Sequence, residues 1–160
     1  VRIADQEGTR AGAFADEVGI DVFGREVAAN GRVRLVYKLK GVERTCLVTD
    51  ALSCAANEGK PLSDPRIIIE DGVCKLADHS SLVGSIATMD RLVRTCVQQA
   101  GIPLADACRM ASETPARIMG ILDRKGTLEA GKDADIIMFD DNLDLRFVMQ
   151  MGRTVRNELA

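Results

Sequence analysis

The clearest pattern of apolar positions lies between residues 85 and 101. Apolar side chains recur at offsets of 0, 3, 6, 7, 10 and 11, which is one face of a helix with 3.6 residues per turn: Ile86, Met89, Leu92, Val93, Cys96 and Val97. Asp90 and Arg94 lie one turn apart on the opposite face, where their charges can pair. The pattern therefore predicts a helix that begins at Ser85 and ends at Gly101.

Two shorter helices are predicted after this one. The first follows Pro103 and has an apolar face made of Leu104, Ala107, Cys108 and Ala111. The second is expected to have Thr114 as its N-cap and Pro115 at its first helical position, where a missing amide hydrogen costs nothing. Gly120 is the expected stop, because glycine adopts the left-handed conformation that ends many helices.

The remaining apolar runs are short and predict strands. Residues 46–48 form a run typical of a buried strand in a parallel sheet. Residues 67–69 and 73–76 flank Asp71-Gly72, a pair that favours a tight hairpin turn. Short strands are also predicted throughout the tail, at 126–128, 136–139 and 148–155. Because these tail strands follow a helical stretch, we place a boundary near residue 122.

Between residues 32 and 40, Arg and Lys alternate with Val33, Leu35, Tyr37 and Leu39. Taken alone, this period of two predicts a strand.

Composition and charge limit the possible functions. The chain has 160 residues, of which 46% are apolar and 28% charged, as in an ordinary soluble protein. The net charge is −3 and the signs are mixed, so no basic stripe is available to bind nucleic acid. No apolar stretch reaches the roughly 18 residues of a membrane helix. Five cysteines without a CxxC spacing predict reduced thiols and a cytoplasmic protein.

Asp50 is the main candidate for chemistry. It stands at the carboxyl end of the predicted strand 46–48, the place where α/β barrels carry their catalytic groups. A carboxylate there must be solvated, paired or set against a metal. The alternative is that Asp50 only caps the following turn.

Several segments resemble known families. Residues 125–137 and 110–117 are similar to the final part of the amidohydrolase superfamily. Residues 47–51 resemble the last barrel strand of N-acetylglucosamine-6-phosphate deacetylases, and residues 82–85 resemble the substrate loop of that family. Residues 36–41 also fit, and there the family has a helix. On this resemblance we predict a helix over residues 30–40, against their alternation.

The resemblance implies an α/β fold. Residues 1–122 would be the C-terminal part of a (β/α)8 barrel, incomplete in this chain, and residues 123–160 would be strands of a small β-sandwich domain. A complete barrel typically needs about 250 residues. We therefore expect the chain to be the C-terminal half of a larger protein, whose full-length form is a homodimer.

The resemblance also implies a reaction. In that family a divalent metal, zinc or a similar ion, and an aspartate activate water for attack on the acetamide of an amino-sugar phosphate. Asp50 matches the aspartate, and Leu82, Val83 and Gly84 match the loop that contacts the sugar. Gly84 would let the backbone approach a ligand, although it can equally be a simple turn before the next helix.

The sequence departs from the family at the metal site. The family's histidine ligands lie upstream of anything in this chain, so no metal-binding residue is predicted here. His79 is the sole histidine, and we expect it on the surface. The family's Ala-Asp-Gly-x-His segment aligns with residues 23–27, where Val27 replaces the histidine.

Two other functions remain open. Because the tail motif is shared across the superfamily, the chain could belong to another amidohydrolase, such as a cyclic amidase or a deaminase. It could also be a non-catalytic remnant that acts as an interaction module. The missing histidines favour the remnant for this chain alone.

Overall fold

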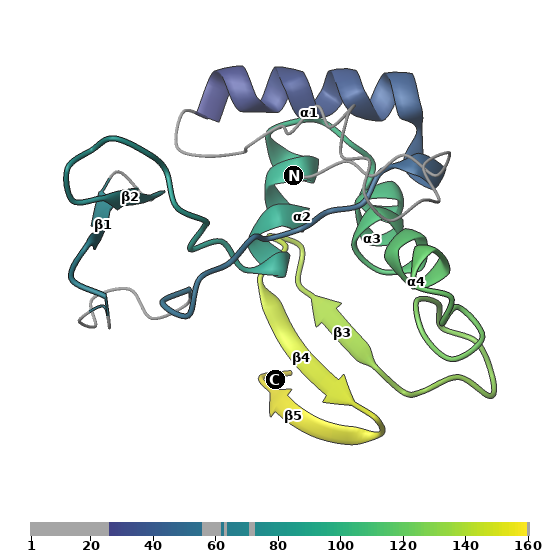
Figure 1. The fold of residues 1–160 in the computed structure, drawn as a ribbon. Helices are drawn as coiled ribbons and strands as arrows, with labels where there is room; N and C mark the ends of the chain where they lie inside the picture. The colour runs from purple at the N-terminus through teal and green to yellow at the C-terminus, as the bar shows by residue number, and fades with distance from the viewer. Residues whose placement is uncertain (1–25, 56–61, 63, 71–72, 160) are drawn as a thin grey trace.

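The computed structural model describes residues 26–55, 62, 64–70 and 73–159. It contains four α-helices and a short 3-10 helix: α1 (Glu26–Lys40), η1 (Val42–Arg44), α2 (Met89–Gln98), α3 (Leu104–Ala111) and α4 (Glu113–Ile118). It also contains five strands: β1 (Ile67–Glu70), β2 (Val73–Leu76), β3 (Ile136–Phe139), β4 (Leu145–Gln150) and β5 (Arg153–Asn157). Helix α1 runs along the top of the view, α2 lies beneath it with α3 and α4 to the right, the β1–β2 hairpin extends to the left, and the three-stranded sheet lies below α2 (Figure 1). Within the described residues, no helix is both long and apolar enough to cross a membrane.

Helix α1 confirms the helical prediction for residues 30–40. Val33 is buried, and Val36 and Tyr37 pack against the same core, at spacings of three and four residues. Leu35 and Leu39, the other two members of the alternating pattern, are 56% and 74% exposed. The alternation is thus misleading, because only part of it faces the core and that part has helical spacing.

Helix α2 begins later than predicted, at Met89 instead of Ser85. Ser85 pairs with Ala51 in an isolated parallel bridge, and its hydroxyl oxygen accepts a hydrogen bond from the Ala87 amide at 2.7 Å. These contacts hold the backbone out of the helix. Ile86 is nevertheless buried, as its place in the apolar pattern suggested.

The core lies where α2, α3 and α1 meet. Leu92, Val93 and Cys96 of α2 are buried as predicted. On α3, Ala107 and Met110 are fully buried, whereas Leu104 is 40% exposed, so the predicted inward face was wrong at Leu104 and omitted Met110. Leu104 is the first residue of α3, and at this end of the helix its side chain remains partly exposed.

Met110→Ala is expected to destabilise the protein by about 2–5 kcal/mol, the usual cost of truncating a fully buried large side chain. Met119→Ala is the matched control, because Met119 is 72% exposed and should change the free energy of unfolding by less than about 0.5 kcal/mol. Urea unfolding of both variants measures the difference. Equal stability losses would place Met110 outside the core.

Thr114 is not the N-cap of α4. It is the second residue of the helix, and its buried hydroxyl donates a hydrogen bond to the Val42 carbonyl at 2.9 Å. Ser112 occupies the cap position, so Pro115 is the third helical residue and not the first. The hydroxyl of Thr114 therefore joins α4 to η1. Gly120, with φ of +70°, follows the helix as predicted.

Residues 46–48 are not a paired strand. Cys46 and Leu47 are buried, but the Leu47 amide donates to the Met110 carbonyl at the end of α3, at 2.9 Å. A β-strand is defined by its backbone hydrogen bonds to a neighbouring strand. Among the described residues no strand lies alongside this segment, so the apolar run is extended chain packed on helices.

The predicted β1–β2 hairpin is present, and a second hairpin, β4–β5, lies where a single strand and turn were predicted. Strands β1 and β2 are antiparallel with Glu70 opposite Val73, and the predicted Asp71-Gly72 turn between them lies outside the described residues. In the tail, β3, β4 and β5 form one antiparallel sheet. Met151 and Gly152 both have positive φ, 48° and 77°, which is the conformation of a two-residue hairpin turn between β4 and β5. Residues 126–128 do not form the predicted strand.

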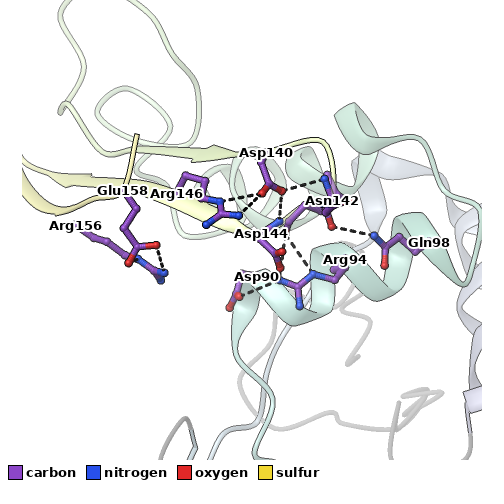
Figure 2. A network of polar contacts seen from close by, with 10 residues as sticks. Asp90, Arg94, Gln98, Asp140, Asn142, Asp144, Arg146, Arg156 and Glu158 are labelled. Carbon is purple, nitrogen blue, oxygen red and sulfur yellow. Dashed lines mark hydrogen bonds and ion pairs between the residues drawn. The ribbon is translucent and has the colours of Figure 1, made fainter. Parts of the chain in front are cut away.

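The sheet is attached to α2 by polar contacts at the β3–β4 turn (Figure 2). Arg94 donates to the Leu143 carbonyl at 3.1 Å and pairs with Asp144 at 3.0 Å. Gln98 donates to the Asn142 carbonyl at 3.0 Å. The predicted pair between Arg94 and Asp90 is also present, at 3.8 Å. Helix α2 therefore fixes the position of the turn, and through it the sheet.

Candidate active site

Asp50 follows the buried segment Cys46-Leu47 and has an unusual backbone conformation. Its φ is +49°, in the left-handed region that non-glycine residues rarely occupy. The residue is exposed, and no described residue donates a hydrogen bond to its carboxylate or pairs with it. The described residues directly after it, 51–55, form a bridge and a turn and not a helix. The capping interpretation therefore has no support in the structure. Strained backbone of this kind is concentrated at functional sites.

The chain returns to Asp50 thirty-odd residues later. The Ser85 amide donates to the Asp50 carbonyl at 2.8 Å, and the Leu52 amide donates to the Ser85 carbonyl at 2.8 Å. These two bonds form a short parallel bridge between Ala51 and Ser85. The structure thus brings Asp50 beside the loop that contains Leu82, Val83 and Gly84.

Gly84 is required by two constraints at the point of contact. Its φ is +65°, and a Cβ atom there would lie 2.8 Å from Leu52 Cγ and 3.0 Å from the Asp50 carbonyl oxygen. Real Cβ atoms do not approach that closely, so a side chain would force the two segments apart. The close approach is to Leu52 and Asp50. Gly84 therefore sets the distance between the loop and the candidate acid.

Strand β2 supports the loop from its other side. The Leu76 amide donates to the Ser81 carbonyl at 2.9 Å, and the Val83 amide donates to the Cys74 carbonyl at 3.0 Å. Among the described residues, nothing accepts the amide hydrogens of Leu82 or Gly84. The Val83 amide is thus used within the fold, whereas the amides of the other two predicted contact residues are not bonded within the described part of the chain.

Sequence reasoning missed Leu52 and misjudged Ser85. Leu52 is the one large aliphatic side chain in the small-residue stretch 51–59, and this isolation was a usable signal. Ser85 was expected to open a helix, but its backbone forms both bonds that hold the site together. No pattern in the sequence indicates that pairing, because it depends on contact between distant segments.

The described residues do not fit a metal centre. No group of three or more His, Cys, Asp or Glu side chains among them converges closely enough to hold an ion. His79 is on the surface as predicted, with its side chain 57% exposed and Nδ1 3.6 Å from Glu70 Oε2. Val27 belongs to α1, and residues 23–25 of the aligned family segment lie outside the described residues.

The 160-residue chain by itself is expected to retain less than about 0.1 equivalents of zinc after dialysis, because a tight zinc site needs three or four convergent ligands. Elemental analysis by inductively coupled plasma mass spectrometry measures this content. A matched sample treated with a chelator gives the background. Stoichiometric zinc would contradict the prediction and identify a ligand set that the described residues do not show.

The chain is similar to known proteins in sequence and structure. The model of the amidohydrolase family matches residues 41–156. An N-acetylglucosamine-6-phosphate deacetylase of Haemophilus influenzae is 34% identical over 131 residues, which is 79% of this chain and 34% of that protein. The Danio rerio protein of the same name is 40% identical over 114 residues, or 68% of this chain and 28% of that protein.

Solved structures give the same result. A crystal structure of N-acetylglucosamine-6-phosphate deacetylase from Pasteurella multocida superposes with a TM-score of 0.71 at 30% identity, covering 80% of this chain and 34% of that one. The Mycobacterium smegmatis enzyme in complex with N-acetyl-D-glucosamine-6-phosphate gives a TM-score of 0.70 at 32% identity, covering 80% and 35%.

The chain spans about a third of the length of these relatives. The family model nevertheless covers well over half of the chain and includes every residue of the candidate site from Asp50 to Ser85. The structural matches confirm a mixed α/β fold. The chain belongs to the amidohydrolase family.

Proposed function

We propose that the native gene product containing this chain hydrolyses the acetamide of N-acetylglucosamine 6-phosphate to glucosamine 6-phosphate and acetate, with Asp50 as the general acid and base. The observation that carries the proposal is the pairing of Asp50 with Ser85, which sets an unpartnered carboxylate beside the Leu82–Gly84 loop. The names of the matching relatives support this substrate.

The proposed role of Asp50 follows from what a free carboxylate can do. It accepts a proton from the water that attacks the acetamide carbonyl, which makes the water a better nucleophile. It then delivers that proton to the nitrogen of the leaving amine. Without the proton, the nitrogen would have to leave as an anion, which is a poor leaving group. Asp50 suits this exchange because its carboxylate is exposed and has no competing partner among the described residues.

The family implies a divalent metal, but the described residues do not fit one, so no step above depends on it. The metal ligands are proposed to lie in parts of the native gene product outside the described residues.

Leu82 and Gly84 are proposed to bind the sugar through their amide hydrogens. Both amides lack an acceptor among the described residues, and both lie on the loop that contacts Asp50. Backbone donors suit sugar hydroxyls because their position is fixed by the strand pairing and not by a flexible side chain. Val83 contributes by holding the loop to Cys74.

The fold proposal follows the same relatives. We place residues 1–122 in the C-terminal part of a (β/α)8 barrel and residues 123–160 in a small β-sandwich domain. Support comes from the position of Asp50 at the end of a buried extended segment, and from the antiparallel sheet that follows the helices.

Hydrolysis of N-acetylglucosamine 6-phosphate, with zinc supplied and the product measured by mass spectrometry, tests the function. Unphosphorylated N-acetylglucosamine and a cyclic amide such as dihydrouracil are the comparison substrates. The proposal expects the phosphorylated sugar to be preferred. Preference for the cyclic amide would identify another amidohydrolase activity. No hydrolysis of any substrate would favour the non-catalytic alternative, which the absence of a metal-binding cluster among the described residues supports.

A further inference from the structure

Two cysteine thiols lie in contact next to the candidate active site. The Sγ atoms of Cys54 and Cys74 are 3.8 Å apart, and the two residues are 20 positions apart in the chain. All five cysteines are free thiols, as the sequence predicted. Within the described part of the chain, this is the one place where two cysteine sulfurs approach each other. Their position indicates a chemical role for the pair.

Each thiol is connected to one of the two segments that form the site. Cys54 lies in the turn after Asp50, closed by a hydrogen bond from the Ala55 amide to the Leu52 carbonyl at 2.9 Å. Cys74 lies in β2, and its carbonyl accepts the bond from Val83 that supports the substrate loop. The turn after Asp50 and the loop that β2 supports are already joined by the hydrogen bonds of Ser85 to Asp50 and Leu52.

We propose that Cys54 and Cys74 form a reversible disulfide that regulates the candidate active site. The geometry requires only a small adjustment, because a disulfide needs the two sulfurs at about 2.0 Å and side-chain rotation can supply part of the change. The effect on turnover rests on the proposed function, whereas the disulfide itself does not.

The chemistry is a two-step exchange with a small organic disulfide such as oxidised glutathione. Cys54 is half-buried and reaches solvent, whereas Cys74 is 0% exposed. The Cys54 thiolate therefore attacks one sulfur of the oxidant, and a glutathione thiolate leaves and takes up a proton. The Cys74 sulfur then attacks Cys54 Sγ and loses its own proton, and the second glutathione leaves as a thiol. Two electrons pass from the protein thiols to the oxidant.

Cys74 is suited to the second step and not to the first. Burial and the neighbouring Cys54 thiol raise the pKa of Cys74 to about 11, so little of it is thiolate near neutral pH. Its contact with Cys54 compensates by making the second attack intramolecular. Cys74 consequently reacts with Cys54 in preference to an external oxidant.

The bond would change the site through the backbone. Drawing the two sulfurs together moves β2 and the turn after Asp50 relative to each other, and the hydrogen bonds from Val83 to Cys74 and from Ser85 to Asp50 transmit that movement to the site. A displacement of about 1 Å at a catalytic centre can cost roughly 10²-fold in rate. We expect the oxidised protein to have a kcat/KM lowered by at least about tenfold.

Peptide mapping tests the disulfide directly. The native gene product is oxidised with glutathione disulfide, alkylated and digested without reduction, and fragment spectra must assign the bridge to Cys54 and not to the nearby Cys46. The bridge is expected in the wild type and in the control Cys108→Ser. It should be absent from Cys54→Ser and Cys74→Ala. A wild type without a 54–74 bridge, or with stable glutathione on Cys54, would overturn the proposal.

Activity tests the regulation. The kcat/KM for N-acetylglucosamine 6-phosphate is measured before oxidation, after oxidation and after reduction by dithiothreitol. The wild type should lose activity on oxidation and regain it, while Cys54→Ser should respond to neither treatment. Unchanged activity in a protein that contains the bridge would overturn the regulatory role. A reduced protein with no deacetylase activity refutes the proposed function, and the peptide map still decides the disulfide.

Discussion

Asp50→Asn is expected to lower kcat by roughly 10²-fold or more while leaving bound metal unchanged, the usual scale for losing a general acid and base. Asparagine keeps the size and shape of the side chain but cannot take up and release the proton. The change should not unfold the protein, because the Asp50 carboxylate is exposed and makes no contact that holds the fold. The measurement is deacetylation by the native gene product, with metal quantified in the same samples.

Asp123→Asn is the matched control. Asp123 is also an exposed acid without a hydrogen bond or ion pair among the described residues, but it lies in the segment after α4, outside the Asp50 site. It should keep full activity. Near-normal turnover of Asp50→Asn would remove the catalytic assignment. Loss of metal together with activity would make Asp50 mainly a metal ligand.

The parts of the fold that the sequence predicts well are those held by local forces. The apolar face of α2 has helical spacing and is buried at Leu92, Val93 and Cys96. The β1–β2 hairpin is encoded by two apolar runs around a turn pair, and the pairing is as expected. Each of these elements forms because its own residues bury one face or close one turn, so a local pattern is sufficient evidence.

The errors occur where a distant segment decides the local structure. Thr114 has the sequence of an N-cap, but its hydroxyl bonds to the Val42 carbonyl, 72 residues earlier in the chain. Residues 46–48 have the composition of a strand, but the Leu47 amide bonds to Met110 in α3. In both places the backbone or side chain has several possible partners. The choice among them depends on tertiary packing, which no short window of sequence contains.

The sequence indicated one part of the candidate site and missed the other part. The position of Asp50 after an apolar run and the similarity to a family both indicated that residue, whereas the similarity alone indicated the loop from Leu82 to Gly84. The physical reason for their proximity, the bridge between Ala51 and Ser85, was not predicted. That bridge needs two segments separated by the β1–β2 hairpin, and only their folding together shows that the hairpin carries the loop back to Asp50.

Gly84→Ala is expected to damage both stability and activity, because the new Cβ meets two constraints. A left-handed conformation costs an L-residue about 1–2 kcal/mol, and overpacking against Leu52 adds about 1–3 kcal/mol. Gly120→Ala is a close control: Gly120 has φ of +70°, near the +65° of Gly84, but a Cβ atom at Gly120 would have nothing within 4 Å. In urea unfolding, Gly120→Ala should lose only the about 1–2 kcal/mol of the left-handed conformation.

The effect on catalysis separates the two glycines further. The Cβ at Gly84 would lie 2.8 Å from Leu52 Cγ and 3.0 Å from the Asp50 carbonyl oxygen, so the loop and the acid must move apart. A shift of about 1 Å there should lower kcat/KM by roughly 10²-fold, whereas Gly120→Ala should retain wild-type kinetics. Adding Leu52→Ala to Gly84→Ala removes the flexible part of the clash and should restore part of the activity. If Gly84→Ala lost no more activity than Gly120→Ala, the spacing between the loop and Asp50 would not limit the reaction.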